Sequence, residues 1–211
     1  MKTYTYSKKE EIYHAITHGI GAILSIAGLV LLIVYSSFSG NPWKIVSVTI
    51  FGTTMLLMYV SSTIVHSLPD GKCKDIFQIF DHSSIYLFIA GTYTPFLLVH
   101  LRGVTGWVLF GIVWGIALTG IVFKVFFVKR FMLLSTLFYI VMGWLIVIAW
   151  KPLTAVMHGQ GIVLLVFGGV VYTIGAIFYV YRKIPYHHVI WHLFVLLGSI
   201  FHFFAIFYYV I

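Results

Sequence analysis

Charged residues are scarce in this chain of 211 residues. Asp, Glu, Lys and Arg together make up 9% of it, and only five residues are acidic. A soluble domain carries roughly 25% charged residues, whereas 61% of this chain is hydrophobic and its mean hydropathy is +1.05. This composition excludes a soluble enzyme domain and indicates an integral membrane protein that crosses the bilayer several times.

Cysteine and long polar stretches are also nearly absent. Cys73 is the only cysteine, which excludes an internal disulfide and a zinc site built from several cysteines. No loop is long enough to carry a nucleic-acid recognition module, so the net charge of +8 does not predict a nucleic-acid partner. The first apolar segment is too long for a signal-peptide core and has no clear cleavage site, so we interpret it as a retained span.

What the sequence does contain is a series of apolar runs separated by short breaks rich in Pro, Gly and basic residues. A helical span needs roughly 20 apolar residues. We therefore predict an all-α integral membrane protein, a bundle of seven transmembrane helices that forms a single domain over residues 1–211. The predicted spans are residues 11–36, 43–68, 77–100, 103–123, 131–150, 159–181 and 186–211.

The basic residues are distributed unevenly between the two sides of the predicted bundle. With seven spans the termini lie on opposite sides, and ten of the 13 Lys and Arg residues fall on the amino-terminal side. Cytoplasmic loops carry an excess of Lys and Arg, so we predict a cytoplasmic amino terminus and an external carboxyl terminus. The ten residues are Lys2, Lys8, Lys9, Lys72, Lys74, Lys124, Lys129, Arg130, Arg182 and Lys183; Lys44, Arg102 and Lys151 lie on the other side.

Two histidines open the last predicted span. His188 and His192 are four residues apart, so a helix places both imidazoles on one face, close enough to share a metal ion. His66 lies near the cytoplasmic end of the second span and therefore at the same predicted depth. Three histidine ligands with an open fourth position are typical of catalytic zinc. We interpret His66, His188 and His192 as ligands of Zn²⁺.

Two further polar residues lie near these histidines in the predicted topology. Ser62 is one helical turn from His66 on the same face, and Asp81 begins the third span at the same depth. Zinc lowers the pKa of a bound water toward about 7 and creates a hydroxide nucleophile. A carboxylate such as Asp81 can accept the proton, and Ser62 can help to position the water. Other residues at this depth have no assigned role: Glu11, His14, Thr17 and His18.

His202 requires a separate interpretation. It follows His188 by 14 residues and so lies on nearly the same helix face, but about 21 Å farther along the axis. It cannot bind the same ion, and we expect it to line a polar cavity beneath the site. Membrane helices that hold two haems can show a 14-residue histidine spacing, but they require a second helix with the same spacing, which this sequence does not offer.

The order of these motifs resembles a known family. Ser62 and His66, then Asp81, then His188 and His192 resemble the seven-helix hemolysin III family, part of the progestin and adipoQ receptor superfamily. The opening motif at residues 11–18 is similar to that family's first motif, with His14 at the position where the family usually has Asn. Residues 91–95 resemble the family's motif in the third helix.

The resemblance implies a seven-helix bundle with its amino terminus inside the cell. It also implies a bacterial plasma membrane as the location, zinc held by His66, His188 and His192, and Asp81 acting on the zinc-bound water. The resemblance also implies a relationship to hormone-responsive receptors and to alkaline ceramidases, which are enzymes that cleave lipid amides. Bacterial members bear a pore-forming name and also resemble proteins linked to membrane-lipid homeostasis.

Four functions follow from these observations. The first is a zinc hydrolase that cleaves a lipid amide or ester, whose lipid or fatty-acyl substrate enters laterally from the membrane. The second is a non-catalytic regulator or receptor of membrane homeostasis with structural zinc. A cytolytic pore former is disfavoured, because apolar helices with ordinary loops indicate a resident membrane protein. An ion or proton transporter would use the histidines and Asp81 as a relay, but the sequence lacks a matched pair of broken helices.

Overall fold

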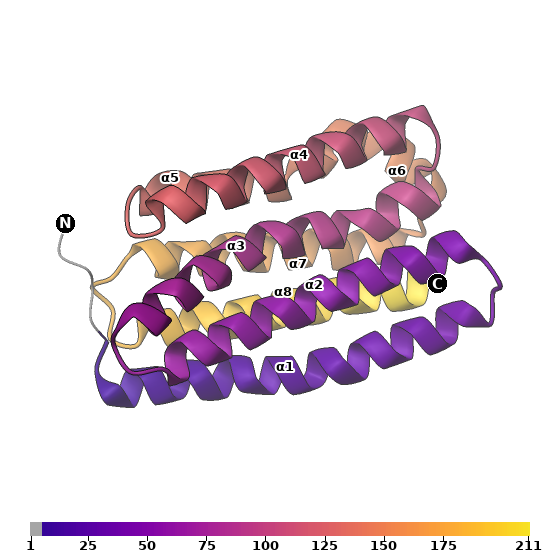
Figure 1. The fold of residues 1–211 in the computed structure, drawn as a ribbon. Helices are drawn as coiled ribbons and strands as arrows, with labels where there is room; N and C mark the ends of the chain where they lie inside the picture. Colours follow the sequence, from indigo (N-terminus) through magenta and orange to yellow (C-terminus); the bar gives the residue numbers. More distant parts are fainter. Residues whose placement is uncertain (1–5) are drawn as a thin grey trace.

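The computed structural model describes residues 6–211, and this part of the chain is helical and contains no strand. The long helices run along one common direction (Figure 1). The elements are α1 (Lys8–Ser37), α2 (Pro42–Ser67), α3 (Lys72–Pro95), the π-helix η1 (Phe96–His100), α4 (Val104–Phe127), α5 (Met132–Gly143), the 3-10 helix η2 (Leu145–Ala149), α6 (Trp150–Val156), α7 (Gly159–Val180) and α8 (His187–Tyr209).

The helices pack in a closed ring. Contacts join α1 to α2, α2 to α3, α3 to α4, α4 to α5, α5 to α7 and α7 to α8, and α8 closes the ring against α1. The start of α1 and the α2–α3, α4–α5 and α7–α8 connections lie at one end of the bundle, whereas α8 ends at the other (Figure 1). The ring therefore brings the start of α1, the end of α2 and the start of α8 together.

The pattern of exposure is that of a protein surrounded by lipid. Large apolar side chains such as Ile23, Leu118 and Phe126 are exposed. The buried positions of α1 are instead mostly small or polar, among them His14 and Ser25. A soluble protein rarely exposes apolar surface on this scale. Small and polar residues facing the bundle interior are typical of helix packing in membranes.

Six stretches of the described chain are long and apolar enough to cross a membrane. They are α1, α2, α4, the composite Met132–Val156, α7 and α8. The protein is thus a multi-pass membrane protein. The predicted count of seven is not reproduced by this criterion, because α3 carries charged residues at its start and Asp81 in its interior. Even so, α3 packs between α2 and α4.

The fifth predicted span is longer and more irregular than residues 131–150. The loop expected at Lys151 and Pro152 is wrong, since both residues lie in the first turn of α6. A proline is tolerated there because the first N–H groups of a helix have no intrahelical partner. The break between α5 and η2 is stabilised by Tyr93, whose hydroxyl lies 2.7 Å from the carbonyl oxygen of Gly143 and accepts a 2.9 Å hydrogen bond from the N–H of Ile146.

The start of α1, at the histidine end, follows from local chemistry. The α1 helix starts at Lys8, earlier than predicted, because Ser7 and Glu10 form a capping box. The Ser7 hydroxyl accepts a hydrogen bond from the Glu10 N–H at 3.2 Å, and the Glu10 carboxylate accepts one from the Ser7 N–H at 2.9 Å. This extra turn places Glu11 and His14 well inside a regular helix.

Candidate metal centre

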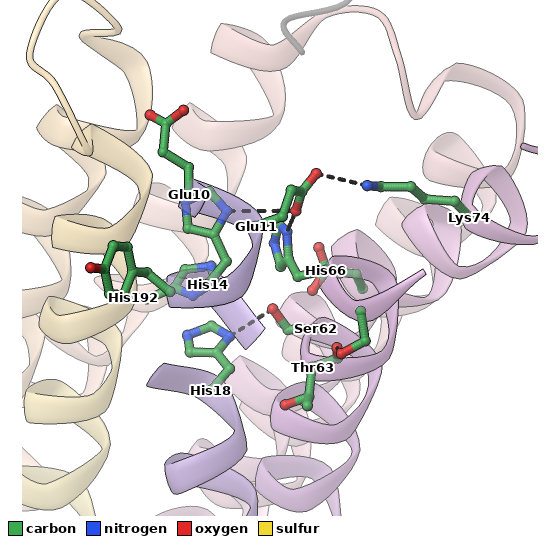
Figure 2. Close-up of polar contacts among 12 residues, drawn as sticks. Glu10, Glu11, His14, His18, Ser62, Thr63, His66, Lys74 and His192 are labelled. Carbon is green, nitrogen blue, oxygen red and sulfur yellow. Dashed lines mark hydrogen bonds and ion pairs between the residues drawn. The ribbon is translucent and has the colours of Figure 1, made fainter. Parts of the chain in front are cut away.

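Three helices deliver histidines to one point at the end of the bundle where α1 begins. The last turns of α2 supply His66, the first turns of α8 supply His188 and His192, and α1 supplies His14 and His18. Figure 2 shows the α1 and α2 side chains facing one another across the contact between these helices. The residues predicted to share one depth in the membrane therefore lie close together in the structure.

The three histidines predicted as ligands lie within reach of a single ion. His66, His188 and His192 each offer a ring nitrogen, and these atoms all lie within 4.8 Å of one another. Among the described residues, Nε2 of His66 and Nδ1 of His188 are buried without a hydrogen-bond partner. A buried polar atom without a partner is costly, and an ion at this point would satisfy both. Three imidazole nitrogens suit zinc.

Hydrogen bonds from neighbouring side chains orient two of these rings. Nδ1 of His66 lies 2.6 Å from Oε2 of Glu11, whose other oxygen accepts a 2.7 Å hydrogen bond from Nζ of Lys74 (Figure 2). Oγ1 of Thr17 lies 3.1 Å from Nδ1 of His192. A ring that donates Nδ1–H to a carboxylate keeps Nε2 free as a ligand, the usual outer arrangement of metal-binding histidines.

Glu11, His14 and His66 form a second group whose possible ligand atoms all lie within 4.8 Å of one another. His14 is fully buried. No role was predicted for Glu11 or His14 from the sequence. Glu11 and His14 are three residues apart, and His18 follows four residues later, so all three lie along one face of α1. This spacing was the feature of the sequence that could have indicated a role for them. It could not indicate which helix that face contacts.

Ser62 and His18 form a buried pair that the sequence did not predict. Oγ of Ser62 lies 2.7 Å from Nδ1 of His18 (Figure 2). The His18 ring in turn stacks on His192, with ring centres 3.5 Å apart and planes 9° from parallel. Ser62 therefore contacts the histidine cluster through His18.

Asp81 lies at the junction of two cavities. A cavity of about 130 Å³ is lined by Asp81, Ser62 and His192 and extends to His202. A larger opening of about 1270 Å³ is lined by Asp81, His66 and basic side chains. His202 lines a cavity next to the histidines, as predicted, but most of the lining of this cavity is apolar and not polar as expected.

A second buried charge accompanies Asp81. The Asp81 side chain is 16% exposed, while Lys124 of α4 is 1% exposed and lines the larger opening beside it. Both side chains line the same opening, where the positive charge of Lys124 can compensate the negative charge of Asp81. A buried carboxylate requires such compensation in a region that excludes water.

Comparison with known proteins shows the family of this chain. A model of the family described as "Haemolysin-III related" matches residues 6–203. The chain is 58% identical over 204 residues to the "Hemolysin-3 homolog" of Bacillus subtilis (strain 168), which covers 97% of this chain and 96% of the relative. It is 53% identical over 211 residues to "Hemolysin-3" of Bacillus cereus, covering 100% of this chain and 96% of the relative.

A more distant similarity places the chain in a wider group. The chain is 26% identical over 203 residues to the human "Monocyte to macrophage differentiation factor", covering 93% of this chain and 83% of the relative. This likeness supports the progestin and adipoQ receptor superfamily, and the Bacillus relatives support a bacterial membrane as the location. The chain is a multi-pass membrane protein that belongs to the haemolysin-III related family.

Proposed function

We propose that this protein is a zinc-dependent hydrolase that cleaves an amide or ester bond of a membrane lipid and takes part in membrane-lipid homeostasis. The observation that carries the proposal is the cavity where Asp81 and Ser62 meet His188 and His192. His66, His188 and His192 would hold the ion. Zinc with three histidine ligands and an open position supplies Lewis acidity there.

The protein's own side chains have distinct tasks in this proposal. Asp81 takes up a proton from the attacking water, a role that needs a carboxylate within hydrogen-bond reach of it. If Nδ1–H of His18 donates to Oγ of Ser62, the Ser62 hydroxyl proton is free to bond to an oxygen of the substrate. A donor aimed at developing negative charge stabilises the transition state.

The cavity beneath the histidines suits an alkyl chain. Most of its lining is apolar, including Ile85, Ile89 and Val195. Such a chain enters from the bilayer, which surrounds the exposed apolar faces of the helices. The reacting head of a lipid would then lie at Asp81, beside the wider opening.

A non-catalytic regulator with structural metal is the second candidate. The observation that favours it is His14, a fourth imidazole inside the cluster. A zinc site closed by four protein ligands is typical of structural sites, whereas catalytic sites keep one position open.

Turnover of lipids distinguishes the two candidates. Purified protein in lipid nanodiscs would be incubated with a ceramide-like amide and with phospholipids, with and without a chelator. The hydrolase predicts release of fatty acid that stops on chelation and returns with added zinc. Protein that retains zinc but releases no fatty acid from any of these lipids would support the regulator instead.

The proposed topology has seven spans, with α3 and η1 as the third. Support comes from the packing of α3 between α2 and α4 and from the basic connections at one end of the bundle. We expect a reporter inserted near Lys72 to behave as cytoplasmic and one fused after Ile211 as external. A cytoplasmic carboxyl terminus would contradict the seven-span topology.

Glu11→Gln tests the outer hydrogen bonds of the proposed zinc site. The substitution removes the charge that orients His66 and pairs with Lys74. We expect zinc affinity to fall about 10–100-fold, as is usual when such a partner is lost. The measurement is a competition titration with a zinc chelator. Glu10→Gln is the matched control, because Glu10 caps α1 and is no member of either candidate ligand group; equal affinities in the two variants would contradict the role of Glu11.

A further inference from the structure

His14 is the least explained polar side chain of the cluster. It is 0% exposed, and neither ring nitrogen has a hydrogen-bond partner among the described residues. Nδ1 of His14 lies 3.7 Å from Oε2 of Glu11, and this distance is too long for a hydrogen bond. An imidazole buried with both nitrogens unsatisfied is costly unless something binds one of them.

The position of the His14 ring indicates what that partner is. Its centre lies 4.6 Å from the centre of His66, 4.8 Å from that of His188 and 5.3 Å from that of His192. The distances among those three rings span the same range, from 4.6 to 5.3 Å. Four imidazoles bound tetrahedrally to one zinc, with Zn–N bonds of about 2.0–2.1 Å, would have ring centres about 5 Å apart.

We propose that His14 is a fourth imidazole ligand of the same metal ion. In the structure the candidate ligand atoms of His14 group with those of Glu11 and His66, so a turn of the His14 side chain is required to bring a nitrogen to the three-histidine point. Because α1 packs against both α2 and α8, the His14 ring already lies among the other three rings.

This inference rests on the proposed function and refines it. With four nitrogen ligands the site is closed, and a lipid or water can reach the metal only after His14 leaves. His14 would then control whether the centre is structural or open for chemistry.

The test counts ligands without relying on activity. Purified protein would be loaded with Zn²⁺ for X-ray absorption, which counts imidazole ligands, and with Co²⁺ for visible spectroscopy in the presence of azide. We expect four imidazoles in the native protein and a cobalt spectrum that azide does not change. His14→Asn should have three imidazoles and one oxygen ligand, and its cobalt spectrum should respond to azide.

The matched control and the remaining outcomes keep the two proposals separate. His18→Asn changes another buried histidine of α1, whose Nδ1 already contacts Ser62, and should leave four imidazoles in place. Native protein with three imidazoles and an azide-sensitive cobalt spectrum would overturn the role of His14 while preserving the three-histidine site. Native protein that binds neither metal would overturn both proposals. Since the native readings alone decide the count, the test does not depend on the folding of a variant.

Discussion

His188→Ala and His192→Ala are each expected to remove most of the zinc from a protein that otherwise carries about one ion per chain. Both residues belong to the group of histidines whose ligand atoms all lie within 4.8 Å of one another. Loss of either one removes one of the three imidazole bonds that hold the ion. Zinc content is measured by inductively coupled plasma mass spectrometry on protein purified in detergent.

The same variants should also be less stable than the native protein. A ligand that binds only the folded state stabilises it by about 4.1 kcal/mol when its concentration is 1,000 times its dissociation constant. Thermal unfolding with and without chelator measures this contribution, which should be present in the native protein and nearly absent in both variants. The control is His158→Asn, an exposed residue before α7 that caps the helix with a side chain that Asn can replace. Zinc retained in both alanine variants would move the metal site elsewhere.

Asp81→Asn is expected to separate zinc binding from hydrolysis. Asp81 belongs to neither group of possible metal ligands among the described residues, but it lines both cavities at the histidine centre. Asn keeps the size and one acceptor oxygen and removes the charge. We expect the variant to retain zinc with affinity lowered about 10–100-fold. Its hydrolytic activity should fall about 100-fold or more, the usual loss for a missing general base.

The measurement is zinc content beside turnover in one preparation. Asp75→Asn is the control, since Asp75 lies on the same helix but is 56% exposed and pairs with Lys129 at 2.6 Å; it should keep both zinc and activity. Complete loss of zinc from Asp81→Asn would make Asp81 a direct ligand. Survival of both zinc and activity would leave Asp81 without a catalytic role and favour the regulator.

Some features of the protein followed from the sequence because they depend on local or one-dimensional properties. The number of long apolar runs and their polar breaks predicted the helices, since a span has a fixed length. The four-residue spacing of His188 and His192 placed both rings on one helix face without any knowledge of neighbours. The alternation of direction from span to span predicted one depth for His66 and Asp81, and the two residues line the same opening.

Helix boundaries that depend on particular hydrogen bonds were predicted less well, because hydrophobic periodicity does not show these bonds. The start of α1 depended on the reciprocal hydrogen bonds of Ser7 and Glu10. The break between α5 and η2 depended on Tyr93, a residue of another helix about 50 positions earlier. Pro152, in the first turn of α6, was predicted to lie in a loop, because the sequence alone does not show where a new helix begins.

Only the tertiary structure decided which helix faces contact one another at the histidine end. The contact between α1 and α8 closes the ring of helices. It brings Thr17 next to His192 and places His14 in the histidine cluster, although more than 170 residues of chain separate Thr17 and His14 from His192. The contact between α1 and α2 joined Glu11 to His66 and His18 to Ser62. The depth of a residue in the membrane can be predicted by counting residues from the end of its span. Which residues are neighbours at that depth depends on how the small and polar faces of all the helices pack around the ring, and this is not visible in any one segment.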